Sequence, residues 1–211
     1  MSRRLEFALP VKADEVPSGP DWLHEIKHDG YRMMVIREGK IVRLRSKTGL
    51  DWSKRFPWIV ETALKLRQER FVIDGEAVVL GVDGISDFDA LQSGKYNDEV
   101  QLYAFDMLAG EGDDYRKLPL FLRKQNLAQL LVRHPEGIQS APSEQGEIGP
   151  ELFRAACKMG LEGLVSKHRE RAYRGGRCDH WRKIKNPVHP GYNRVQASHS
   201  RRTRLTLEEA L

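Results

Sequence analysis

The sequence predicts an α+β fold in which largely antiparallel sheets carry helices on their outer sides. Short segments with apolar alternation or short apolar runs outnumber segments with helical spacing, and turn residues separate many of them. Strands and helices do not alternate regularly, and no glycine-rich loop ends in Gly-Lys-Ser or Gly-Lys-Thr. These observations exclude a doubly wound parallel sheet with a nucleotide-binding loop of that kind.

Length and composition indicate one soluble globular domain. The chain has 211 residues, of which 40% are hydrophobic and 31% are charged. No apolar run approaches the roughly 20 residues that span a bilayer, and the N-terminus lacks the apolar core of a secretory signal. Cys157 and Cys178 are far apart and form no CxxC pair. We therefore expect a cytoplasmic protein with free thiols and no membrane partner.

Positive charge is concentrated in one part of the chain. The net charge is +5 at pH 7, and the segment 158–185 alone contains nine lysines and arginines against three acidic residues. A solvated protein face is the ordinary explanation of such a run. A surface for nucleic acid or polyphosphate is the alternative, and charge alone does not decide between them.

The octet 25–32, Glu-Ile-Lys-His-Asp-Gly-Tyr-Arg, is the segment around which the rest of the chain is organised. Apolar residues on both sides predict a strand, a tight turn at Asp29-Gly30 and a second strand, with Gly30 supplying the turn geometry. Lys27 then lies where the first strand ends. It is either a solvated lysine beside a hairpin or a nucleophile, and a nucleophilic amine needs desolvation or neighbouring cations to lose its proton.

The remaining N-terminal half gives clear local signals. Residues 1–20 contain three prolines and are expected to wrap the surface ahead of the first strand. Alternation predicts a strand over 41–45, and helical spacing predicts a helix over 56–66. Residues 71–80 form the strongest strand signal, although Asp74-Gly75-Glu76 interrupts it with polar groups. A bulge with Glu76 in solvent explains this interruption, and a functional carboxylate is the other explanation.

The C-terminal half alternates short helices and strands less regularly. Apolar spacing predicts helices over 88–91, 120–132 and 151–159, the last of them ended by Gly160. Strands are expected over 100–108, 138–141, 162–167 and 180–185, and Asn186-Pro187 stops the last one. A basic glycine-containing loop, 173–177, separates the final two strands.

Lys27-x-Asp29-Gly30-x-Arg32 resembles the nucleotide-attachment motif of the covalent nucleotidyltransferases, namely ATP-dependent DNA ligases, RNA ligases and mRNA capping enzymes. The amino-acid sequence of residues 22–32 is most similar to that of the ligase domain of bacterial end-joining DNA ligases. Further segments resemble the other motifs of that family in the same order, and these are 45–49, 72–76, 103–108, 162–167 and 181–187. Their order makes a chance match very improbable.

The resemblance implies a covalent nucleotidyltransferase (ATP-grasp-like ligase adenylation) fold over residues 1–187, with ATP as the cofactor. It implies that Lys27 carries AMP as a phosphoramidate, while Lys183 and Lys185 contact the α-phosphate and favour the neutral amine. Glu76 and Glu162 are the implied Mg²⁺ ligands, because Mg²⁺ prefers carboxylates together with phosphates and water. The counterpart of Glu76 also approaches the ribose.

The same resemblance assigns the nucleoside contacts. Phe105 is the ring expected to stack on the purine, with core packing as its ordinary alternative, and Val165 or Leu164 closes the other side. Glu25 is expected to meet the adenine edge through its backbone. Arg32 is expected to contact the ribose or a DNA phosphate.

DNA contacts are expected from a small set of cations, and these are Arg45, Lys47, Lys167, Arg174 and Arg177. The family more often has arginine where Lys47 stands, so a bidentate phosphate contact is not expected there. The implied substrate is nicked or broken duplex DNA, sealed between a 5′-phosphate and a 3′-hydroxyl.

Residues 188–211 do not resemble the OB-type barrel that follows this domain in relatives, and they are expected to form a flexible, basic polar tail. End-joining proteins, or a separate chain that supplies the barrel, are the expected partners. Two other functions stay open from the sequence. One is an RNA ligase or capping-type nucleotidyltransferase, although the sequence of residues 22–32 argues against it. The other is a non-catalytic module that binds DNA ends.

Overall fold

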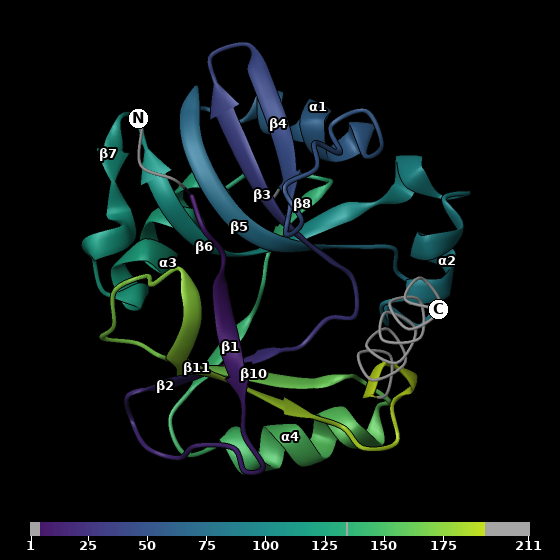
Figure 1. Ribbon diagram of the computed structural model, residues 1–211, viewed down its shortest axis with the longest axis vertical. Helices are drawn as coiled ribbons and strands as arrows, with labels where there is room; N and C mark the ends of the chain where they lie inside the picture. The colour runs from purple at the N-terminus through teal and green to yellow at the C-terminus, as the bar shows by residue number, and fades with distance from the viewer. Residues whose placement is uncertain (1–4, 134, 193–211) are drawn as a thin grey trace, which may run out of the picture.

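Two β-sheets organise the computed structural model, which describes residues 5–133 and 135–192 (Figure 1). The first sheet has the strand order β1-β11-β10-β2-β9. Its strands are β1 (Ala8–Lys12), β2 (Trp22–Ile26), β9 (Ser143–Gln145), β10 (Gly163–His168) and β11 (Gly176–Lys185). All its strand pairs are antiparallel except β1 with β11, so the predicted sheet type is confirmed here.

The second sheet has the strand order β4-β3-β5-β6-β7, and β8 pairs in parallel with β6. Its strands are β3 (Tyr31–Glu38), β4 (Ile41–Ser46), β5 (Arg70–Val78), β6 (Gln101–Gly110), β7 (Asp113–Asp114) and β8 (Ile138–Ser140). β5 stays one strand through Asp74-Gly75-Glu76, where the register with β6 shifts. The polar interruption in the sequence is therefore a bulge.

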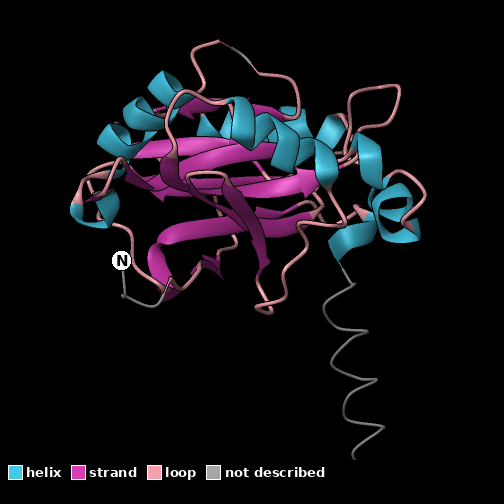
Figure 2. Ribbon diagram, turned by 90° about the horizontal axis from the view of Figure 1, so that it is seen from above, coloured by secondary structure: helices cyan, strands magenta, loops and turns pink. Residues whose placement is uncertain are grey.

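Helices cover the outer sides of the sheets, as Figure 2 shows for the second one. The helices are α1 (Pro57–Lys65), α2 (Phe88–Ser93), α3 (Leu120–Leu130) and α4 (Gly149–Lys158), with short 3-10 turns at Asn97–Glu99, Tyr115–Lys117 and Pro190–Tyr192. α1 and α3 pack on the second sheet, and α4 packs on β10 of the first. The α+β prediction is confirmed.

β3 is buried on both faces, because the protein has one apolar cluster on each side of the second sheet. Met33 and Val35 pack with the helix-covered side of the second sheet. Met34 and the partly buried Ile36 point the opposite way, toward Trp181 on β11 and Tyr173 in the loop between β10 and β11. Apolar contact between the sheets, which is worth about 25 cal/mol per Å² buried, holds them together.

The central octet does not form the predicted hairpin. β2 belongs to the first sheet and β3 to the second, so residues 27–30 carry the chain from one sheet to the other. Gly30 is also needed for a different reason than predicted, because its φ is not in the left-handed region. A Cβ atom at Gly30 would lie 2.3 Å from the carbonyl oxygen of Ala77. The crossing sets Lys27 between the two sheets.

One further expectation changes at the N-terminal end, and one stays a prediction at the C-terminal end. Residues 1–20 are not only a surface wrap, because Ala8–Lys12 forms an edge strand parallel to β11. Its pairing partner lies more than 160 residues away, which is why local patterns gave no signal for it. The predicted tail starts at residue 188, and the part of it beyond residue 192 lies outside the described residues.

Candidate active site

A cleft of about 170 Å³ lies between the two sheets, with walls from both of them. It brings together charged residues predicted from distant motifs, which are Glu25, Lys27, Arg32, Lys47 and Glu76. Phe105, Val165, Lys167 and Lys183 also line it. The sequence motifs therefore meet at one place in the fold.

Glu162 holds two of the predicted catalytic lysines. Its Oε2 atom accepts a hydrogen bond from Nζ of Lys27 at 2.5 Å, and its Oε1 atom lies 3.0 Å from Nζ of Lys185. The carboxylate is 3% exposed, whereas the side chain of Lys27 is 21% exposed. The amine of Lys185 also donates to the carbonyl of Gly191 at 2.9 Å. The amine of Lys27 is therefore accessible from solvent, and the buried carboxylate of Glu162 fixes its position.

Lys183 stands beside this pair on β11. Burial lowers the pKa of its amine, and the positive charges of Lys27, Lys185 and Lys47 lower it further. Four amines therefore surround one region of the cleft, and Glu162 is the acidic group paired with two of them. An excess of cations of this kind suits a polyphosphate, whose oxygens would replace the missing negative charge.

Glu76 faces the same region from the second sheet. Burial raises the pKa of its carboxyl to about 7, and Glu162 and Asp74 reinforce the shift while Lys27 and Arg32 oppose it. Within the described ranges, no three His, Cys, Asp or Glu side chains form a metal site by themselves. Glu76 nevertheless fits a divalent cation that also binds phosphate oxygens, because such a cation would stabilise its charged form. Both oxygens of Glu162 are already occupied by lysines.

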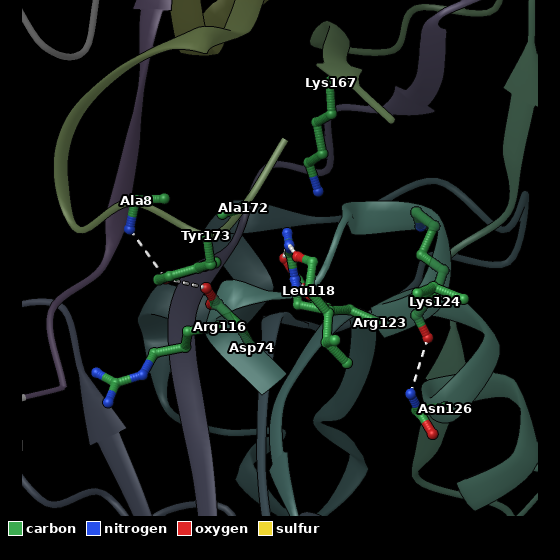
Figure 3. Close-up of polar contacts among 12 residues, drawn as sticks. Ala8, Asp74, Arg116, Leu118, Arg123, Lys124, Asn126, Lys167, Ala172 and Tyr173 are labelled. Atoms are coloured by element: carbon green, nitrogen blue, oxygen red, sulfur yellow. Dashed lines mark hydrogen bonds and ion pairs between the residues drawn. The ribbon is translucent and has the colours of Figure 1, made fainter. Parts of the chain in front are cut away.

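Arg32 is fixed inside the protein. Its Nε and terminal nitrogen atoms each donate to Asp74 at 2.7 Å, and Asp74 is fully buried. Figure 3 shows the hydroxyl of Tyr173 between this carboxylate and the backbone of Ala8; the hydroxyl donates to Asp74 at 2.8 Å and accepts from Ala8 at 2.9 Å. The bonds to Asp74 hold the pKa of Arg32 above its usual range despite burial. This network joins β1, β3 and β5.

Lys167 corrects one sequence prediction. The sequence predicts that it contacts DNA, yet its side chain is 2% exposed and donates to Oε2 of Glu25 at 2.6 Å. Its amine lies 3.8 Å from the ring centre of Phe105 and 4.2 Å from that of Trp181. Burial lowers the pKa of Lys167 to about 8 against the attraction of Glu25. A lysine buried in this way is not available to a DNA phosphate.

Sequence reasoning missed the partner that completes this buried group. Lys124 on α3 places its amine 2.7 Å from Oε1 of Glu25. Burial alone would raise the pKa of Glu25, but Lys124 and Lys167 together bring it below the ordinary value. The amphipathic pattern of α3 identified the helix, but nothing in it indicated that Lys124 would reach across to β2.

His28 also lines the cleft, and it lies within the octet 25–32, although the resemblance assigns it no role. Its ring packs against Tyr103 at 4.4 Å, and its Nδ1 atom is 3.1 Å from the hydroxyl of Ser86. Burial lowers the pKa of His28 to about 4, so the ring is neutral at physiological pH. It is a fixed, uncharged wall next to Lys27.

The remaining predicted DNA-binding residues are all at the surface. Lys47 is exposed and borders the cleft, and Arg45 is partly exposed on β4. Arg174 and Arg177 are exposed as well, but Arg174 lines a separate groove and not the cleft. The cleft therefore has Lys47 at its mouth as the nearest of these cations.

Comparison with known proteins agrees with this geometry. The sequence model of the family described as "ATP dependent DNA ligase domain" matches residues 11–185. The chain belongs to that family. It is 37% identical over 185 residues to the multifunctional non-homologous end joining protein LigD of Pseudomonas aeruginosa, a match that covers 85% of this chain and 22% of that protein. It is 34% identical over 180 residues to a probable DNA ligase of Streptomyces coelicolor, covering 78% of this chain and 35% of that one.

Solved structures give the same family assignment for the fold. The ligase domain from M. tuberculosis LigD has a TM-score of 0.71 and 29% identity, covering 84% of this chain and 60% of that one. A mycobacterial DNA ligase D complexed with ATP and MES has the same scores and coverage. The predicted ligase adenylation fold is confirmed. The chain spans about a fifth of the length of the LigD relative from Pseudomonas aeruginosa. In the described part of this ligase-family domain, no helix is both long and apolar enough to cross a membrane.

Proposed function

We propose that this domain transfers AMP from ATP to Lys27 and then to DNA, as the catalytic domain of an ATP-dependent DNA ligase. The observation that carries the proposal is the amine of Lys27, which lies in the cleft between two sheets and is held by Glu162, with Lys183 and Lys185 beside it. Nicked or broken duplex DNA is the proposed substrate, and the end-joining proteins of related systems are the proposed partners.

In the first step the nitrogen of Lys27 attacks the α-phosphorus of ATP. A P–N bond forms, the P–O bond to the β-phosphate breaks, and pyrophosphate leaves with the bonding electron pair. The amine must release a proton and separate from Oε2 of Glu162, which is the acceptor already in contact with it. Lys183 and Lys185 offset the negative charge that develops on the phosphate oxygens.

The nucleoside is proposed to bind beside this centre. Phe105 and Val165 line the cleft from opposite sheets, so a purine between them contacts both. Lys167 and Arg32 lie 3.8 and 4.6 Å from the ring centre of Phe105, and a stacked purine would compete with them for its faces. Glu76 is proposed to hold the ribose or, with phosphate oxygens, Mg²⁺. Bound there, Mg²⁺ would supply charge neutralisation of the phosphates.

In the later steps AMP passes to a DNA 5′-phosphate, and a 3′-hydroxyl displaces it to form the phosphodiester. Both transfers again place negative charge on phosphate oxygens near Lys27, so the same lysines serve all three steps. Lys47 is the exposed cation at the cleft mouth and is proposed to contact the DNA backbone there. Arg45 on the adjoining strand is proposed to assist it.

The test is incubation with ATP labelled at the α-phosphate in the presence of Mg²⁺. The wild-type protein should become labelled, and the label should be acid-labile and base-stable, as expected for a phosphoramidate. Lys27→Ala should remain unlabelled because it has no amine, and Lys27→Arg should remain unlabelled because a guanidinium keeps its proton. Lys65→Ala, which changes an exposed lysine on α1, is the matched control and should label normally. Label on the Lys27→Ala protein would overturn the proposal.

A further inference from the structure

The outer face of the first sheet carries a groove of about 580 Å³ that is separate from the cleft. Side chains alternate along its strands, so neighbours point to opposite faces. Lys167 and Trp181 line the cleft, whereas the residues that follow them, His168 and Arg182, line the groove. The groove therefore lies behind the sheet that forms one wall of the active site, on the face that α4 partly covers.

Three arginines and one carboxylate surround this groove, and Arg174 is the arginine whose charge Asp179 feels. Arg171, Arg174 and Arg182 are exposed, and none forms an ion pair with an Asp or Glu of the described segments. The acidic residue of the groove, Asp179, is 3.4 Å from His180. Three guanidinium groups against one carboxylate leave an excess of positive charge, which favours an anionic ligand that offers several oxygens.

The loop that carries two of these arginines is anchored. The carbonyl of Arg171 accepts from the backbone of Leu120 at 3.1 Å and from the buried guanidinium of Arg123 at 3.1 Å. The ring of His180 lies 3.1 Å from the carbonyl of Ala172, which ties the loop to β11. The positions of the arginines are thus set by the fold, which reduces the ordering cost of binding.

An aromatic ring lies among these cations. Trp22 is partly exposed, and the guanidinium carbon of Arg182 is 5.1 Å from its ring centre. His168 packs edge-on against the same indole with ring centres 5.5 Å apart. An acidic peptide would engage the arginines but would leave the indole unused. A nucleic acid strand uses both kinds of group, because its phosphates bind arginine and its bases stack on aromatic rings.

We propose that this groove binds a single-stranded nucleic acid segment, with phosphates on Arg171, Arg174 and Arg182 and a base on Trp22. The inference rests on the proposed function for the presence of DNA at this domain. A duplex keeps its bases stacked inside, so a base is free to reach the indole when the strand is unpaired. The groove would hold an unpaired stretch of the substrate away from the phosphate that is being joined.

The experiment measures the binding of a fluorescent twelve-nucleotide oligothymidine and of a duplex of the same length by anisotropy. The double variant Arg171→Ala/Arg182→Ala should bind the single strand at least about tenfold more weakly. The slope of the logarithm of the binding constant against the logarithm of the salt concentration should become less steep by about 1.4, or about 0.7 for each phosphate that is no longer neutralised. The matched control, Arg67→Ala/Arg70→Ala, removes the same charge from an exposed region that contains Glu69 and Glu111, and it should change the affinity little.

Trp22→Leu separates stacking from charge. It should weaken single-strand binding about tenfold, leave the salt slope unchanged and leave duplex binding unchanged. Equal losses in the two arginine double variants would overturn the proposal, because only total charge would then matter. An equal loss of duplex and single-strand binding in Arg171→Ala/Arg182→Ala would overturn it too.

Labelling of the same proteins with ATP, in the absence of DNA, separates this inference from the proposed function. Arg171 and Arg182 are outside the cleft, so their double variant should label like the wild type. An unlabelled wild-type protein would contradict the proposed function and would leave the oligonucleotide measurement to be judged on its own. Normal labelling together with unchanged oligonucleotide binding in the double variant would contradict only the groove.

Discussion

The amine of Lys27 lies 2.5 Å from Oε2 of Glu162, a carboxylate that is 3% exposed. The proposed nucleophile therefore forms an ion pair with a buried carboxylate. Attack on phosphorus requires the nitrogen of Lys27 to leave this contact. Glu162 therefore positions Lys27 before the reaction and must separate from it during the reaction.

The substitution Glu162→Gln keeps the size of the side chain and removes its charge. We expect the maximal rate of label transfer to fall, because Lys185 also loses its carboxylate partner. Single-turnover labelling of both proteins at saturating ATP measures this rate. A Glu162→Gln protein that is labelled as fast as the wild type would show that the carboxylate does not position Lys27.

Glu76 predicts a pH-dependent change in stability. Its pKa is raised from 4.5 to about 7, so the folded protein binds this proton more tightly than the unfolded chain. The stability that this proton contributes is present below pH 4.5 and is lost as the pH rises through about 7. Above that range Glu76→Gln should be more stable than the wild type, because it removes a charge that burial disfavours. We expect a difference in unfolding free energy on the order of 1–2 kcal/mol, since partial exposure of the side chain to solvent limits it.

Urea unfolding without nucleotide at about pH 8 and about pH 4.5 measures this difference, which should shrink at the lower pH. Glu61→Gln on α1 is the matched control, because that side chain is exposed and its substitution should change the free energy of unfolding little at either pH. A Glu76→Gln protein less stable than the wild type at pH 8 would contradict the assignment. The same variant should lose label transfer, which separates its functional role from its cost to folding.

Lys167 and Lys47 should respond differently to alanine. Lys167→Ala leaves the buried carboxylate of Glu25 with Lys124 as its remaining partner, and breaking such a pair costs about 3 kcal/mol of unfolding free energy. Lys47 is exposed, so Lys47→Ala should change stability by less than about 0.5 kcal/mol. It should weaken binding to nicked duplex instead. Urea unfolding and anisotropy of labelled nicked DNA distinguish the two, and equal stabilities would contradict the burial argument.

The sequence predicted those elements whose signals are local. α1, β5 and β6 follow from apolar spacing within ten or so residues, and the ordered motifs identified most of the residues that line the cleft. The crossing at 27–30 was misread as a hairpin because two strands joined by a short turn look alike whether they share a sheet or not.

Long-range pairing explains the remaining errors. β1 owes its conformation to β11, and Pro10 within it, followed by Pro17 and Pro20, is typical of a loop. The sequence groups Lys167 with the basic residues expected to contact DNA, but its partner Glu25 is 142 residues away and reaches it across adjacent strands. Lys124 and Asp74 acquire their roles in the same way, from contacts that no local pattern encodes.

Gly30 gives a prediction that separates close packing from turn geometry. A Cβ atom there would lie 2.3 Å from the carbonyl oxygen of Ala77 and 2.9 Å from a methyl group of Val78. Gly30→Ala must therefore push the start of β3 away from β5, at a cost of about 2–3 kcal/mol. Because Lys27 is three residues earlier in the same crossing, its amine should be displaced and label transfer should fall at least about tenfold.

Gly84→Ala is the control for Gly30→Ala. Gly84 has a φ of +75° and no atom within 4 Å of its missing Cβ, so alanine meets backbone strain there but no collision. We expect a loss of about 1 kcal/mol and normal label transfer. If Gly30→Ala labelled as well as Gly84→Ala, the crossing would tolerate a shift of β3, and the close approach to Ala77 would not be what positions Lys27. Urea unfolding and single-turnover labelling of the two variants in parallel decide the matter.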